Sequence, residues 1–104
     1  MKSNKLVIRI HKPVAVVFAF TITPPNSTRW IPKVIGETTD KWPVEVGTVY
    51  KLRLADGTYS KVTVKAIKRD DLVEWQSKEG NYHCRYEFKL LKKSLTEMEY
   101  IEWV

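Results

Sequence analysis

Five runs of alternating apolar and polar residues fill the second half of this 104-residue chain, and turn residues separate them. The runs cover residues 49–55, 58–68, 72–78, 82–91 and 95–104, and a weaker run covers residues 34–41. Alternation with a period of two is typical of a strand with one buried face. Because the separations between the runs are short, we expect consecutive strands to pair antiparallel, as a meander.

The turn lengths predict the register of the hairpins, because a slip of one residue would invert the faces of a strand. A three-residue loop at 55–57 places Leu52 on the side of Ser60, and a two-residue turn at Asp70 and Asp71 sets Ala66 opposite Trp75. The other predicted pairs are Trp75 with Cys84, Val73 with Tyr86, Phe88 with Met98, Tyr86 with Tyr100 and Lys89 with Glu97.

This register gathers the apolar residues on one face of the sheet. That face carries Tyr50, Leu52, Leu54, Val62, Val64, Ala66, Val73, Trp75, Tyr82, Cys84, Tyr86, Phe88, Leu90, Met98 and Tyr100. The wet face carries Lys51, Arg53, Lys61, Thr63, Lys65, Glu74, Gln76, His83, Arg85, Glu87, Lys89, Glu97 and Glu99. A sheet with one apolar face has to cover that face with helices or with another sheet.

The first third of the chain supplies one strand and two short helical segments. Residues 6–10 alternate as a strand does. In residues 13–23, Val and Phe favour a strand, whereas Pro13 at a first helical position and the length of the segment favour a helix. Residues 26–30 are typical of a short capped helix that ends before Pro32. We therefore predict a single α+β domain over residues 1–104, with an antiparallel sheet of six to seven strands and two short N-terminal helices.

This order of elements resembles the START-like (SRPBCC) helix-grip superfamily, which includes polyketide cyclases/dehydrases, relatives of the birch allergen and lipid-transfer domains. The segments that carry the resemblance are IRIHKPVAVVF at 8–18, WIPKV at 30–34 and PVEVGTVY at 43–50. The resemblance implies a curved sheet that grips a long C-terminal helix, with an apolar ligand cavity between the two. This sequence departs from the pattern because it ends at Val104, inside the last strand, so we expect a truncated helix-grip fold.

A sheet without the closing helix leaves many large apolar side chains uncovered, and monomers rarely expose so much apolar surface. We therefore expect a second copy of the chain, in a homodimer, or a partner protein to close the concave face. A chain cut short before the closing helix would show the same sequence pattern, so this alternative stays open. The expected ligand is a small apolar or amphipathic molecule. The residues expected to line its cavity are Tyr50, Leu52, Val64, Trp75, Cys84, Tyr86, Phe88, Met98, Tyr100 and Glu102.

Glu102 is the candidate acid or polar ligand contact, because it shares the parity of Met98 and Tyr100. If the Glu102 side chain is covered, its pKa should rise. Alternatively, because Glu102 lies two residues from Val104, its side chain is simply solvated. The carboxylates of Asp70, Asp71, Glu97 and Glu99 are explained by turns and by cross-strand pairing with Lys89 and Arg85.

His83 and Cys84 are neighbours on one strand, so they point to opposite faces and cannot form a catalytic dyad. We expect Cys84 to be an inert packed thiol, and His83 and His11 to be surface residues. No third ligand with metal spacing is present, so we predict no metal and no cofactor. A single Cys excludes an internal disulfide and favours a reducing compartment.

The net charge of +6 comes entirely from residues 1–35, which hold Lys2, Lys5, Arg9, Lys12, Arg29 and Lys33 and no acid. This excess could attract an anionic membrane or nucleic acid, but scattered charges are typical of a solvated surface. The uncharged stretch 13–28 is too short to span a bilayer and has no cleavage pattern of a secretory signal. We expect a cytoplasmic protein without integral membrane association.

Aromatic side chains on the apolar face could stack nucleic-acid bases, but the basic residues of the sheet lie on the other face. We therefore expect these rings to form core or cavity lining, with no nucleic-acid partner. The loop 36–47 holds Trp42, which would be either part of a mobile cover over the cavity or a packed staple.

Three hypotheses on function follow. The leading one is a non-enzymatic binding module for a small apolar or amphipathic molecule. The second is an interaction domain whose apolar face is a dimer or heteromer interface. The third is a cyclase- or hydrolase-like enzyme. General acid–base catalysis would have to rely on Glu102 and the tyrosines of the apolar face, so an enzyme is the less favoured of the open interpretations.

Overall fold

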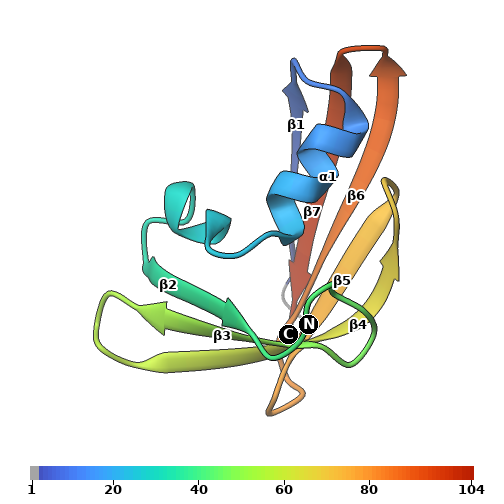
Figure 1. Cartoon of the computed structure of the whole chain (residues 1–104). Coiled ribbons are helices and arrows are strands. Elements are labelled where there is room, and N and C mark those ends of the chain that lie inside the picture. The colour runs from blue at the N-terminus through green and yellow to red at the C-terminus, as the bar shows by residue number, and fades with distance from the viewer. Residues whose placement is uncertain (1–2) are drawn as a thin grey trace.

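The chain folds into one strongly curved antiparallel sheet with helical segments on one side of it (Figure 1). A computed structural model describes residues 3–104; Met1 and Lys2, the latter one of the six basic residues of the first third, lie outside the described part. The elements are β1 Ser3–Ile10, α1 Val14–Ile22, the 3-10 helix η1 Asn26–Arg29, β2 Val34–Thr39, β3 Val49–Leu54, β4 Tyr59–Lys68, β5 Leu72–Ser77, β6 His83–Lys92 and β7 Leu95–Trp103. The predicted α+β class is therefore confirmed.

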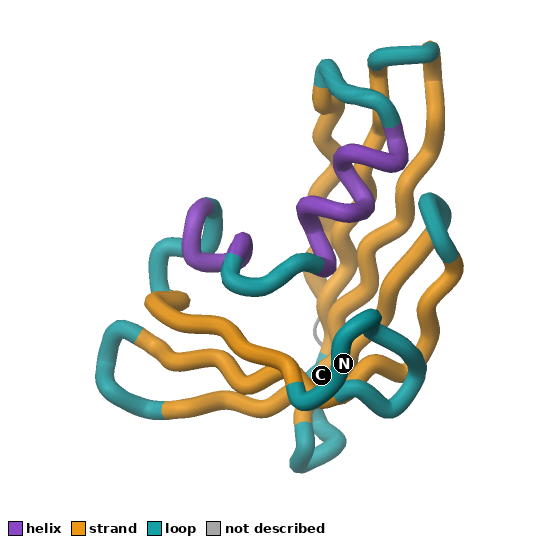
Figure 2. Tube along the Cα trace, viewed as in Figure 1, coloured by secondary structure: helices purple, strands orange, loops and turns teal. Residues whose placement is uncertain are grey.

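The seven strands have the order β1-β7-β6-β5-β4-β3-β2. Strands β2 to β7 form the meander, and β1 adds to it beside β7. β1 pairs antiparallel with β7, and Ser3 lies opposite Trp103. The sheet bends so that β2 and β3 run across the direction of β1 and β7 (Figure 2). This bend produces a concave side, and α1 and η1 lie on that side.

Packing rather than local propensity explains why residues 14–22 are helical. The segment VAVVFAFTI is rich in β-branched and aromatic residues, which lower helix propensity. Pro13 sits at the N-cap, and its carbonyl accepts the N–H of Val17 at 3.2 Å. Phe18 is 6% exposed and meets Phe88 of β6 edge to face, with ring centroids 5.4 Å apart. Burial of one such ring contributes about 1.5–3 kcal/mol, which holds α1 on the sheet.

The hydrophobic core lies between α1 and the concave side of the sheet. Its buried members are Val17, Phe18, Tyr50, Val62, Val64, Val73, Trp75, Tyr86, Phe88 and Met98. Eight of these ten come from the face that the alternation predicted as apolar. The charged residues of the other face are exposed or partly exposed, and some form ion pairs there, as Arg85 does with Glu74 at 3.2 Å.

Most of the predicted register is confirmed, including the pairs of Trp75 with Cys84 and of Phe88 with Met98. The predicted pairing of Ala66 with Trp75 is wrong: Val64 lies opposite Trp75 and Ala66 lies opposite Glu74. The turn between β4 and β5 holds three residues, 69–71, and not the predicted two, which moves the partner of Ala66 by one residue. A bulge between Val64 and Ala66 moves the pairing by one more residue, so that Val64 meets Trp75. Glu99 also differs from expectation, because it pairs with Lys5 of β1 at 3.3 Å and not with Arg85.

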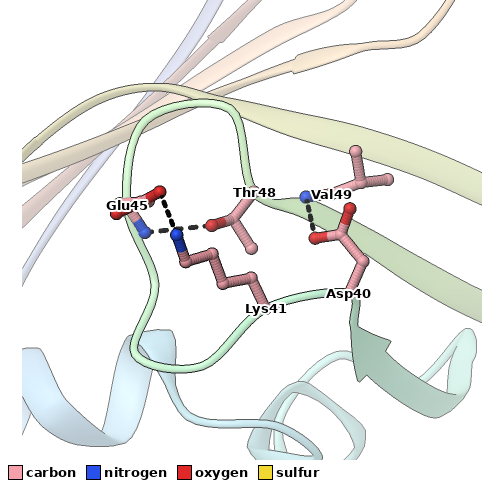
Figure 3. A network of polar contacts seen from close by, with 5 residues as sticks. All are labelled: Asp40, Lys41, Glu45, Thr48 and Val49. Carbon is pink, nitrogen blue, oxygen red and sulfur yellow. Dashed lines mark hydrogen bonds and ion pairs between the residues drawn. The ribbon is translucent and has the colours of Figure 1, made fainter.

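The loop between β2 and β3 is held by its own polar contacts (Figure 3). The Asp40 carboxylate accepts the N–H of Val49 at 2.9 Å, and the Thr48 hydroxyl accepts the N–H of Glu45 at 3.0 Å. Trp42 is 55% exposed, so the expectation of a packed staple is wrong. Within residues 3–104, no helix combines the length and the hydropathy that crossing a membrane requires.

Candidate functional site

The concave side of the sheet holds a cavity of about 550 Å³, bounded by the sheet, by η1 and by the segment that joins η1 to β2. Eight of the ten residues predicted to line a cavity are on its wall: Tyr50, Leu52, Trp75, Cys84, Tyr86, Met98, Tyr100 and Glu102. Val64 and Phe88 are not: Val64 is fully buried, and Phe88 packs against α1. The role of these wall residues in binding a ligand stays a prediction.

Edge-to-face contacts and one tilted contact connect the aromatic rings of the wall. The centroid of Trp75 lies 5.4 Å from that of Tyr50 and 5.7 Å from that of Tyr86, with the rings nearly perpendicular. Tyr86 also contacts Trp30 at 5.8 Å and Tyr100 at 4.8 Å. Such pairs are more favourable than stacked sandwiches and restrict each ring. The cavity therefore has a preformed aromatic wall.

At one end of the cavity, Glu102 accepts hydrogen bonds from two tyrosines. The hydroxyl of Tyr100 donates to Glu102 Oε2 at 2.6 Å, and the hydroxyl of Tyr82 donates to the same oxygen at 2.8 Å. Asn4 Nδ2 donates to Oε1 at 3.1 Å. These bonds, that of Tyr100 above all, hold the pKa of Glu102 below its ordinary value. The rise of this pKa that burial would cause does not occur, because Glu102 is too little buried for desolvation to outweigh three hydrogen bonds.

A second carboxylate, Glu37 of β2, also lines the cavity and was not among the predicted site residues. It is 8% exposed and accepts hydrogen bonds from Ser27 of η1, from Oγ at 2.6 Å and from the backbone N–H at 3.3 Å. Burial raises the pKa of Glu37, and the bonds from Ser27 oppose that rise. Strict alternation would turn Glu37 outward, but a bulge between Val34 and Gly36 turns it inward. The sequence signal was the glycine, since a glycine inside a strand often marks a bulge.

Cys84 lies on the cavity wall, and burial raises the pKa of its thiol to about 12. It is therefore a protonated thiol at neutral pH and a poor nucleophile. His83 stacks on Trp103 with ring centroids 5.0 Å apart and an interplanar angle of 3°. Trp42 is not among the residues that line the cavity. Among residues 3–104, no three His, Cys, Asp or Glu side chains lie close enough together to hold a metal ion.

No protein-family model matches the sequence, and no curated protein matches it in sequence. Several solved structures share its fold. XoxI from Bacillus cereus has a TM-score of 0.79 at 12% identity, over 98% of this chain and 74% of that chain. The Aha1 dimer from Colwellia psychrerythraea has a TM-score of 0.75 at 16% identity, over 97% and 75%. Norcoclaurine synthase from Thalictrum flavum, in complex with dopamine and hydroxybenzaldehyde, has a TM-score of 0.72 at 12% identity, over 97% and 67%.

At these identities the likeness is one of fold. The chain has a truncated helix-grip fold, in which a curved antiparallel sheet carries α1 and η1 on its concave side, as predicted.

Proposed function

We propose that this chain is a START-like binding module for a small apolar or amphipathic molecule, which it holds in the concave cavity. The observation that carries the proposal is a cavity of about 550 Å³ whose wall combines preformed aromatic rings with a few polar groups. Ligand sites in proteins are typically concave, largely apolar and of this size. Norcoclaurine synthase, which shares the fold, is in complex with two small aromatic molecules, and this supports the proposal.

Two substitutions on β3 test the proposal, because neighbouring residues of a strand point to opposite faces. Leu52 lines the cavity, whereas Lys51 lies on the outer face. We expect Leu52→Trp to fill part of the cavity and to weaken binding of the neutral fluorescent probe N-phenyl-1-naphthylamine at least about tenfold, or about 1.4 kcal/mol. Lys51→Trp is the matched control and should bind the probe as the wild type does.

Saturable probe binding by the wild type, lost in Leu52→Trp alone, would support the proposal. Absence of saturable binding by the wild type would contradict it. Native mass spectrometry of the freshly purified chain adds an independent observation, because it detects any small molecule that co-purifies in the cavity.

A second candidate function is a homodimerisation domain, with or without ligand. Three large apolar residues that line the cavity are exposed: Leu6 by 56%, Ile8 by 37% and Trp30 by 41%. A second copy that packs over them would close the cavity on its open side. The solved Aha1 structure, which shares the fold, is a dimer, and this supports the assignment.

A further inference from the structure

Three oxygen atoms form a close triangle at one end of the cavity. They are Tyr82 Oη, Tyr100 Oη and Glu102 Oε2, and we name them the acceptor triangle. Its sides measure 2.6 Å between Tyr100 and Glu102, 2.8 Å between Tyr82 and Glu102, and 3.0 Å between the two hydroxyls. All three residues line the cavity. Tyr86, packed on the ring of Tyr100, helps to hold the triangle in place.

The protons of the acceptor triangle can be counted. Burial, as the largest cause, raises the pKa of both Tyr82 and Tyr100, while hydrogen bonding lowers that of Glu102. At neutral pH the two phenols therefore keep one proton each and the carboxylate has none. Both protons point to Glu102, or one points to Glu102 and the other to the second hydroxyl. In either arrangement every proton stays inside the triangle.

The acceptor triangle therefore offers a ligand only lone pairs, together with one negative charge. A ligand group that itself brings only lone pairs, such as a carboxylate or a phosphate, would find no donor there. A group with several N–H donors and a positive charge is complementary to it. An ammonium nitrogen has three donors, and charge-assisted N–H···O bonds are about 2.7–2.9 Å long, which suits a position above three mutually close oxygens.

The groups around the acceptor triangle include one competing cation. Lys33 lines the same cavity, and its charge contributes to the lowered pKa of Glu102. Lys33 is exposed, and among residues 3–104 no carboxylate oxygen lies within 4.0 Å of its nitrogen. The net charge of +6 also repels cations at long range. A preference for a cation would therefore have to come from the triangle itself and not from the overall field.

We propose that the acceptor triangle binds the protonated amine of a small amphipathic ligand, whose apolar part lies against the aromatic wall. The inference rests on the proposed function, since it names the chemical class of the molecule that the cavity holds. Tyr86 and Trp75 supply ring faces and edges for the apolar part, and Met98 supplies a flexible thioether beside them. The charged end and the apolar end of the ligand are thus recognised by different parts of one cavity.

Three ligands with the same apolar body test the inference by isothermal titration calorimetry at pH 7. They are 2-(1-naphthyl)ethylamine, which is cationic, 2-(1-naphthyl)ethanol, which is neutral, and 1-naphthylacetate, which is anionic. We expect the amine to bind the wild-type chain at least about tenfold more tightly than the alcohol, and the carboxylate to bind most weakly. This comparison needs no variant, so it does not depend on how a variant folds.

Substitutions then locate the preference. Glu102→Gln should reduce the advantage of the amine over the alcohol to less than about threefold. Glu99→Gln removes the same charge from the outer face of the same strand and should keep the full advantage. Tyr82→Phe removes one oxygen of the acceptor triangle and should reduce the advantage in part.

The outcomes separate the two proposals. Equal binding of amine and alcohol by the wild type would overturn the ammonium site and leave the binding module in place. A full advantage of the amine in Glu102→Gln would also overturn it, because the preference would then come from elsewhere in the cavity. Failure of all three ligands, and of the neutral probe, to bind would overturn the proposed function and the inference with it.

Discussion

Glu37 and Glu102 line the same cavity, but burial dominates the titration of the first and hydrogen bonding that of the second. The carboxylate of Glu37 lies between β2 and η1, where it accepts two hydrogen bonds from Ser27. Glu102 lies at the more open end and has three donors. Because a shifted pKa links proton binding to folding, the two residues should affect stability in opposite pH ranges.

Glu37 should make the protein less stable as the pH rises. Its pKa is raised in the folded chain, so between the ordinary value of 4.5 and the raised value the folded state binds more protons than the unfolded state. Its contribution to stability is therefore complete below pH 4.5 and is lost as the pH rises through the folded pKa. We expect Glu37→Gln to remove this decline, as measured by urea unfolding from pH 4 to pH 8.

Glu102→Gln supplies the contrast for that experiment. The pKa of Glu102 is lowered in the folded chain, so its contribution is present above pH 4.5 and is lost as the pH falls through the folded value. The variant should therefore lose stability at neutral pH and match the wild type in strong acid. If both variants changed stability over the same pH range, the assignment of the two pKa directions would be wrong.

At the scale of the element, α1 depends on its contact with the sheet, since its own residues favour a strand. Phe18 is 6% exposed, whereas Phe20 on the same helix is 41% exposed. We expect Phe18→Ala to lower the free energy of unfolding by about 3–5 kcal/mol, because it opens a cavity against Phe88. Phe20→Ala is the control and should cost far less in the same urea unfolding experiment. Similar losses in both variants would contradict this account of the helix.

The strands were more predictable than their faces. Alternation and turn length predicted the hairpin of β5 with β6 and that of β6 with β7. The register shift between Leu90 and Lys92 lies next to the turn, beyond the facing pairs such as Phe88 with Met98. Alternation and turn length failed at Ala66, where the turn after β4 is one residue longer than predicted and β4 has a bulge beside Ala66. They also failed at Glu37, where a bulge adds a residue and reverses the parity beyond it. Hydrophobic periodicity does not reveal where a β-bulge interrupts a strand. The same bulge in β2 explains why Glu37 escaped sequence analysis.

The polar contacts of the site were less predictable than its wall. The alternation of β7 predicted that Glu102 faces the apolar side. Its three hydrogen-bond donors, however, come from β1, from β7 and from the residue before β6. Asn4 is 98 positions away along the chain. Such contacts depend on the pairing of β1 with β7, which no hairpin turn specifies.

At the scale of the whole molecule, the exposed residues of β1 allow a test of dimerisation. Leu6 faces the cavity, and its neighbour Val7, 44% exposed, faces outward. If a second copy closes the cavity, Leu6→Glu should weaken the dimer by about 2 kcal/mol, or about thirtyfold in Kd. Val7→Glu carries the same charge on the other face and should leave the dimer intact. A wild-type chain that stays monomeric in native mass spectrometry at all concentrations would contradict the dimer.

The pairing of Ser3 with Trp103 affects how the chain can fold during its synthesis on the ribosome. The chain is made from its N-terminal end, so of the strands of the described sheet β1 emerges first and its partner β7 emerges last. The hairpins of β3 to β6 can form while synthesis continues, since their partners are adjacent in the sequence. Throughout that time β1 remains an unpaired apolar strand, open to chaperones or to the wrong neighbour.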